Sequence, residues 1–79
     1  MIFQDYDVVA LKSDIQGIHK ENQRPILLQA GQVGTVVMSF NHEAYLIDFS
    51  DAQGMTYAME TVPSDQLILL HYEPLSIAA

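Results

Sequence analysis

The sequence predicts an all-β domain: a small barrel of five short antiparallel strands, with a long first loop and a short 3-10 turn before the last strand. Three observations support this. Segments rich in β-branched and aromatic residues are too short for globular helices, turn-forming residues separate them, and only the first connection is long. A meander this small must curl to bury both faces and protect its edges. The expected strands span residues 6–12, 34–40, 44–50, 55–62 and 67–72.

The first strand is followed by the longest connection in the chain. The strand, 6–12, is rich in valine, whereas the loop, 13–31, begins with polar residues and contains Pro25. Within the loop, the segment PILLQA at 25–30 is either a short extended piece or a single helical turn. Periodicity does not distinguish these two alternatives in so short an apolar run.

Two glycines precede the stiffest predicted strand. Gly31 can adopt the positive φ that is needed to leave the long loop, and Gly34 permits a bulge or a sharp bend where the sheet curls. The β-branched run at 35–37 then supplies a stiff pleated surface. Both glycines are therefore predicted to have structural roles.

Turn signals separate the later strands. The asparagine that opens 41–43 tolerates left-handed dihedral angles, and the segment DAQG at 51–54 has Asp first and Gly last, as a reverse turn favours. Pro63 is expected to begin the 3-10 turn, a structural role that its fixed φ suits. Alternation along the strands predicts a core made of Val8, Ala10, Val33, Val37, Tyr45, Ile47, Phe49, Tyr57, Val62, Leu67 and Leu69.

Four segments, DVVALKSDI, GQVGTVVMSF, AYLIDFSDAQGMTYAM and TVPSDQLILL, resemble a family of short bacterial proteins that carries only a domain-of-unknown-function label and has many cyanobacterial members. The resemblance covers about residues 5–70, with motifs at 7–11, 31–37 and 63–67. The central motif is shared by many SH3-like barrels, including small subunits of photosynthetic electron-transfer complexes and transcription-factor modules. The resemblance therefore implies a five-stranded SH3-like barrel and supplies no activity. The segment between residues 15 and 31 is longer than in a typical member.

Length, composition and charge set further bounds. One domain, 1–79, is expected, with its core in about 5–72 and a tail at 73–79. The net charge is −7, and no cationic residue follows Arg24, so neither a nucleic acid nor a membrane surface is expected as a partner. No apolar run approaches the roughly 18 residues of a membrane span, and no secretory leader is recognisable, which favours a cytoplasmic location. The acidity either keeps the domain soluble or forms a face for a basic protein.

No catalytic or metal-binding pattern is recognisable. Cysteine is absent, and His19, His42 and His71 do not have the i, i+2 or i, i+4 spacing of a metal-binding pair. His42 and Glu43 are neighbours in a turn, where their side chains point in different directions. The segment GQVG at 31–34 lacks the glycine spacing and the lysine of a phosphate-binding loop. We therefore expect no enzymatic activity, no cofactor and no metal.

Apolar side chains give the strongest signal, and it is for protein binding. PILL at 25–28 and LILL at 67–70 are consecutive apolar runs, so alternation points half of each outward. Either the long loop folds over the outward side of the last strand, or another chain covers it. Two exposed tyrosines would be neighbours if the first and last strands pair. The predicted partner-binding residues are Ile26, Leu27, Leu28, Tyr6, Tyr72 and Ile68.

These observations predict a non-enzymatic protein–protein interaction module, or a small accessory subunit. It would bind a protein partner, or a second copy of itself, through the long loop and an apolar edge, with an unprotected edge strand as the expected geometry. Two alternatives stay open. One is an acidic protein that neutralises a basic partner, as an immunity protein or antitoxin does. The other is an accessory subunit of a photosynthetic electron-transfer complex, which rests on fold-level resemblance alone.

Overall fold

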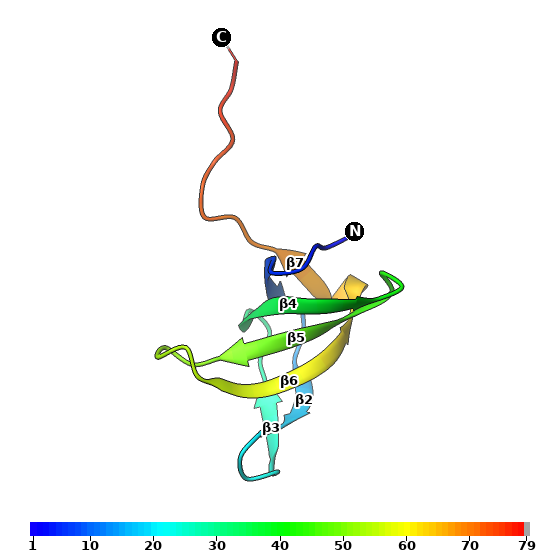
Figure 1. Cartoon of the computed structure of the whole chain (residues 1–79), viewed down its shortest axis with the longest axis vertical. Coiled ribbons are helices and arrows are strands. Elements are labelled where there is room, and N and C mark those ends of the chain that lie inside the picture. Colours follow the sequence, from blue (N-terminus) through cyan, green and yellow to red (C-terminus); the bar gives the residue numbers. More distant parts are fainter. Residues whose placement is uncertain (79) are drawn as a thin grey trace.

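The computed structural model describes residues 1–78 and confirms an all-β protein (Figure 1). Within these residues the chain forms seven strands and one 3-10 turn. They are β1 (Val8–Leu11), β2 (Ile15–Ile18), β3 (Pro25–Leu28), β4 (Val33–Phe40), β5 (Ala44–Ser50), β6 (Thr56–Pro63), η1 (Ser64–Gln66) and β7 (Leu67–Leu69). The turn η1 confirms the predicted 3-10 turn before the last strand. Residue 79, the last of the predicted tail, lies outside the described residues.

The five predicted strands form one antiparallel sheet, here called the main sheet, in the order β6-β5-β4-β1-β7. β5 has the predicted bounds, whereas β7 ends at Leu69 instead of residue 72. β1 pairs with both β4 and β7, so the first and last strands are neighbours. In the described part of the chain, the outer strands β6 and β7 do not pair with each other. The main sheet is therefore open, and a closed five-stranded barrel is not confirmed.

Most of the predicted long first loop is a β-hairpin. β2 and β3 pair in a second, two-stranded sheet, with Ile15 opposite Leu28 and Ile18 opposite Pro25. Of the two alternatives for 25–30, the extended piece is correct. Pairing explains this outcome, because the two strands satisfy each other's backbone N–H and C=O groups. In Figure 1 the hairpin lies at the lower end of the molecule, near β6, and β7 lies at the upper end.

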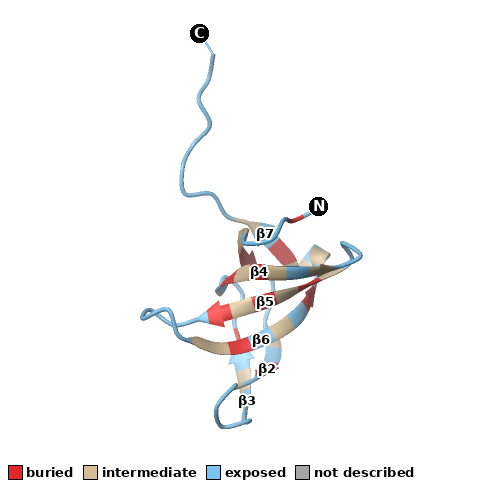
Figure 2. Cartoon of the chain, viewed as in Figure 1, coloured by how far each residue is buried: buried red, intermediate tan, exposed pale blue. Residues whose placement is uncertain are grey.

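The core lies on the inner face of the main sheet, and the alternation of buried and partly exposed positions along β5 is visible in Figure 2. The N-terminal segment and the hairpin each add one large side chain to it, Phe3 and Leu28. Six of the predicted core residues are buried, including the whole inward row of β5. The buried apolar residues are Phe3, Val9, Ala10, Leu11, Leu28, Val36, Tyr45, Ile47, Phe49, Ala58, Val62 and Leu67.

The face assignment is wrong in β1, where the core takes Val9 and Leu11 instead of Val8 and Ala10, and in the first half of β4. In β6 it is wrong at one position. Val36 is buried, whereas the predicted core residue Val33 is 49% exposed. The register between β4 and β5 shifts between Val36 and Met38, so a bulge interrupts the alternation. A face assigned from the second half of the strand is consequently the wrong face in the first half. In β6 the predicted Val62 is buried, but its buried companion is Ala58 and not Tyr57. The predicted core residues that are only half-buried are Val8, Val37, Tyr57 and Leu69.

The two glycines have different roles. Gly31 has a φ of +88°, which confirms the predicted left-handed exit from the first connection. Gly34 is not the site of the bulge, which lies further along β4. A Cβ at Gly34 would collide with the Cγ2 methyl of Ile47 and would lie 3.1 Å from both the carbonyl oxygen of Asp48 and Cδ1 of Phe49. Gly34 is therefore required by the close approach of β5.

The predicted turns are present. Asn41 and His42, between β4 and β5, have left-handed φ angles of +55° and +58°, and the Glu43 N–H donates to the Phe40 carbonyl oxygen at 3.1 Å. The Gly54 N–H donates to the Asp51 carbonyl oxygen at 3.0 Å, which confirms the reverse turn before β6. Pro63 occupies the N-cap of η1, as predicted.

The N-terminal segment belongs to the folded domain. The ring of Phe3 is 2% exposed and packs edge-on against Tyr45, with ring centroids 5.2 Å apart and planes at 85°. The Phe3 N–H donates to the hydroxyl of Tyr45 at 3.0 Å, and Nδ1 of His42 lies 3.2 Å from the same hydroxyl. One hydroxyl thus ties the N-terminal segment to the β4–β5 turn.

Beyond β7 the chain runs away from the body of the molecule as an extended tail (Figure 1). Each of the residues from 70 to 78 is exposed. The tail carries two large apolar side chains, Leu75 and Ile77, each 94% exposed. Within residues 1–78, nothing covers these two side chains.

Candidate functional site

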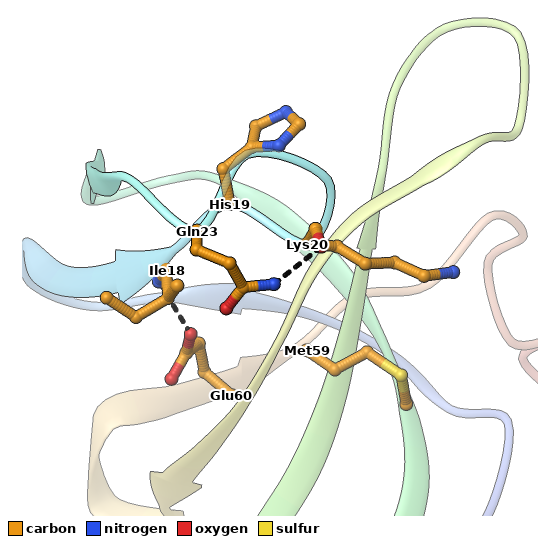
Figure 3. A pocket seen from close by; sticks show the side chains of 6 residues that line it. All are labelled: Ile18, His19, Lys20, Gln23, Met59 and Glu60. Atoms are coloured by element: carbon orange, nitrogen blue, oxygen red, sulfur yellow. Dashed lines mark hydrogen bonds between the residues drawn. The ribbon is translucent and has the colours of Figure 1, made fainter.

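A hollow of about 290 Å³ lies between the β2–β3 hairpin and β6. Figure 3 shows its lining, which combines two apolar side chains with four polar ones. The residues that line it are Ile18, His19, Lys20, Gln23, Met59 and Glu60. We call this feature the hairpin groove. It brings the predicted interaction loop next to the outer strand of the main sheet.

Two hydrogen bonds hold the hairpin against β6. The N–H of Lys20 donates to the carbonyl oxygen of Tyr57 at 2.8 Å. The N–H of Ile18 donates to Oε2 of Glu60, also at 2.8 Å, so that this carboxylate takes the place of a backbone carbonyl (Figure 3). Gly17 makes room for the contact, since a Cβ there would lie 3.1 Å from the same carboxylate oxygen. The hairpin is therefore anchored to the edge of the main sheet.

The tip of the hairpin is ordered by its own hydrogen bonds. The His19 N–H donates to the Arg24 carbonyl oxygen at 2.8 Å, and the Gln23 N–H donates to the His19 carbonyl oxygen at 2.9 Å. The side-chain amide of Gln23 donates to the carbonyl oxygen of Lys20 at 2.9 Å (Figure 3). The ring of His19 stacks on Tyr57 with centroids 6.4 Å apart. These contacts pre-form the groove before any partner binds.

Alternation divides the apolar residues of the hairpin between two faces. Ile26 and Leu28 point inward: Ile26 is partly buried against the core, and Leu28 is fully buried within it. Leu28, predicted to bind a partner, instead stabilises the fold. Leu27 points outward and is 60% exposed. Ile18 and Pro25 are the paired residues on the same outward face, so the hairpin presents a short apolar strip.

An apolar surface that the sequence did not predict continues from this strip onto the outer face of the main sheet. Met59 lines the hairpin groove and is exposed. Further along the same face, Met38 pairs with Leu46 across β4 and β5, and Phe40 pairs with Ala44. The sequence of β5 contained an indication of this surface, because Ala44 and Leu46 are apolar although they lie on the face opposite the core.

The other predicted partner-binding residues lie around β1 and β7, at the opposite end of the molecule from the hairpin (Figure 1). Ile68 is 49% exposed on β7, and Tyr6 and Tyr72 are 81% and 88% exposed. The pairing of β1 with β7 fulfils the condition for the two tyrosines to be neighbours. However, the last hydrogen bond of the pair joins the Leu70 N–H to the Val8 carbonyl oxygen, and the chain then turns away. The predicted residues thus form two separate surfaces.

The potential catalytic side chains are not gathered at one place. His19 belongs to the hairpin, His42 to the β4–β5 turn, and His71 to the segment after β7. Within residues 1–78, no three His, Asp or Glu side chains are placed to hold a metal ion. Ser39 Oγ lies 3.3 Å from Nδ1 of His42, but the same hydroxyl accepts the His42 N–H at 2.9 Å. This serine therefore caps a turn.

The fold and the groove define a class: a small all-β protein with an open, curved antiparallel sheet and an anchored hairpin that carries exposed apolar side chains. The chain belongs to the family described as domain of unknown function (DUF4926), whose model matches residues 5–69. This confirms the predicted membership of a family without an assigned function. Comparison with curated proteins and with solved structures gives no match. In the part of the chain that the structure describes, no helix has the length and apolar character to span a membrane.

Proposed function

We propose that this protein is a non-enzymatic interaction module that binds a partner protein through the β2–β3 hairpin and an apolar edge. The observation that carries the proposal is Leu27, a large apolar side chain 60% exposed on a hairpin whose backbone is already ordered. Ordered apolar side chains give binding energy without a large entropy cost. Ile18 and Met59 extend this surface into the groove, and Lys20 and Glu60 supply a polar rim.

The fold that supports this role is proposed to be a partly open SH3-like barrel. The strand order of the main sheet and the position of η1 before β7 favour this assignment. The β2–β3 hairpin would cover part of the gap between the outer strands, since the Lys20 N–H bonds to the carbonyl oxygen of Tyr57 on β6. A hairpin in this position would act as one wall of the binding surface.

The energy available from the hairpin can be estimated from one residue. Covering the exposed part of Leu27 would contribute about 1–2 kcal/mol at the usual value for buried apolar area. The change Leu27→Asp removes that contribution and places a charge in an apolar contact. We expect it to weaken partner binding by about ten- to a hundredfold.

The test is capture of a partner from the native host with the full chain as bait, followed by measurement of its affinity by calorimetry. Gln16→Asp is the matched control, because Gln16 is paired with Leu27 on the same outward face and the change adds the same charge without removing an apolar group. Wild type and Gln16→Asp should retain the partner, and Leu27→Asp should lose it. Equal affinity of all three proteins would refute a role for the hairpin.

The acidic composition supports a second candidate function, the neutralisation of a basic protein. The chain carries ten acidic and three cationic residues. Ionic strength separates the two candidates, because binding through exposed charges weakens strongly with salt, whereas apolar binding does not. A partner released at high salt would favour neutralisation, and a salt-resistant partner would favour the hairpin. An accessory role in photosynthetic electron transfer has only the fold resemblance behind it and would require co-purification with such a complex.

A further inference from the structure

The free edge of β7 is the second unpartnered feature of the fold. The Leu70 N–H donates to the Val8 carbonyl oxygen at 2.9 Å, and the Lys12 N–H donates to the Gln66 carbonyl oxygen at 2.8 Å. In an antiparallel pair these bonds recur at every second residue, so Ile68 is the β7 residue bonded to β1. The N–H and C=O groups of the residues on either side of it face away from β1. The Leu67 N–H is already bonded to the Ser64 carbonyl oxygen. In the described part of the chain, the groups left to accept another strand are the Leu67 C=O and both backbone groups of Leu69.

A hollow of about 390 Å³ adjoins this edge. All three residues of β7 line it, together with Met1 and Lys12. Leu67 is buried in the core, so the apolar surface comes from Leu69, which is only partly buried, and from Ile68, which is exposed. Lys12 is one of only three cationic residues in the chain. The edge therefore offers backbone hydrogen bonds and apolar surface, and Lys12 and Asp65 give the hollow charges of both signs.

The tail has the complementary chemistry. Leu75 and Ile77 flank Ser76, so an extended tail presents both apolar side chains on one face. Pro74 lies just before them, at the one strand position where a missing N–H costs nothing. Glu73 supplies the negative charge that Lys12 would attract. In the single chain the tail runs away from the edge and does not fold back along it (Figure 1).

We infer that residues 75–77 of a second copy pair with β7, and that two copies exchange their tails reciprocally. In a two-fold exchange each chain gives one tail and receives one on β7, so that neither tail nor β7 edge is left open. Five residues lie between Leu69 and Leu75, which gives a reach of roughly 20 Å for extended chain and allows the two domains to lie side by side. This inference deepens the edge half of the proposed function, and leaves the hairpin groove free for a different protein.

The test is sedimentation equilibrium of the full chain over a range of concentrations. Wild type should be a reversible dimer. Leu75→Asp should raise the dissociation constant by about a hundredfold or more, because the dimer loses one buried anchor at each of its two tail contacts. Ser76→Asp is the matched control, since it adds the same charge at the adjacent residue, on the opposite face of the tail. A wild type that stays monomeric, or a dimer that Leu75→Asp leaves unchanged, would overturn the inference.

A disulfide test identifies the contact itself. The chain contains no cysteine, so every disulfide that forms joins two introduced thiols. A protein with Ile68→Cys and a second with Ser76→Cys should form a mixed disulfide when combined and oxidised, because both positions fall on the outward face of the paired strands. A dimer that is lost in Leu27→Asp but forms no such disulfide would overturn the tail exchange and assign self-association to the hairpin. Neither result depends on capture of a separate partner, so failure here leaves the hairpin proposal to its own test.

Discussion

Replacing Gly34 with alanine is expected to be among the most damaging single-methyl additions to this protein. The new Cβ would overlap the Cγ2 methyl of Ile47 and approach the carbonyl oxygen of Asp48 to 3.1 Å. The side chain of Ile47 is fully buried and the carbonyl belongs to a central strand, so neither can move without disturbing β5. Overpacking of this kind costs about 1–3 kcal/mol. A cost of about 2 kcal/mol lowers the melting temperature of a domain this small by roughly 8–16 °C.

Gly31→Ala is the appropriate comparison, because it separates a steric cost from a conformational one. Gly31 has a φ of +88° but has open space where a Cβ would be placed. Its replacement should cost only about 1 kcal/mol, the penalty of an alanine in the left-handed region. Thermal unfolding of the two variants, followed by circular dichroism, measures the difference. If Gly34→Ala is as stable as Gly31→Ala or more so, the close approach of β5 to Gly34 is refuted.

Two further predictions concern the ends of the main sheet. Phe3→Ala should destabilise the protein by about 3–5 kcal/mol because the ring is buried. Tyr45→Phe should cost only about 1 kcal/mol, the value of the hydrogen bond that the hydroxyl accepts from the Phe3 N–H. Urea unfolding measures both costs, and equal values would contradict the packing described. Glu60→Ala should accelerate amide hydrogen exchange at Ile18, because the Ile18 N–H loses its acceptor. Glu60→Gln should not accelerate it, because the oxygen of the side-chain amide can still accept. Equal exchange rates in both variants would show that the carboxylate does not anchor the hairpin.

The parts of the fold that follow local rules were predictable. Burial alternates strictly along the strand at 44–50, and the bounds and inward face of this strand were both predicted correctly. Turns marked by Asn41 or by the 51–54 segment need only local backbone preferences. A bulge leaves no such mark: nothing in the run of valines after Gly34 indicates that the register shifts before Met38. The face of β4 could not be assigned for this reason.

Long-range contacts account for the remaining differences. Phe3 joins the core through Tyr45, which is 42 positions away in the chain, and no local pattern signals that contact. The hairpin was treated as a loop because PILL is ambiguous by itself and β2 is interrupted by Gly17. Once the hairpin exists, alternation alone buries Leu28 and exposes Leu27. The apolar composition of the hairpin therefore predicted a binding surface, but only the structure shows which of its side chains face outward.

The position of Phe3 has a practical consequence for the limits of the domain. A fragment limited to the family match, residues 5–69, would lack this ring, and the hydroxyl of Tyr45 would lose the hydrogen bond that it accepts from the Phe3 N–H. Such a fragment would carry a hole at one end of its interior. The folded domain therefore begins before the residues that the family model matches. A stability measured on the shorter fragment would underestimate the free energy of unfolding of the native domain.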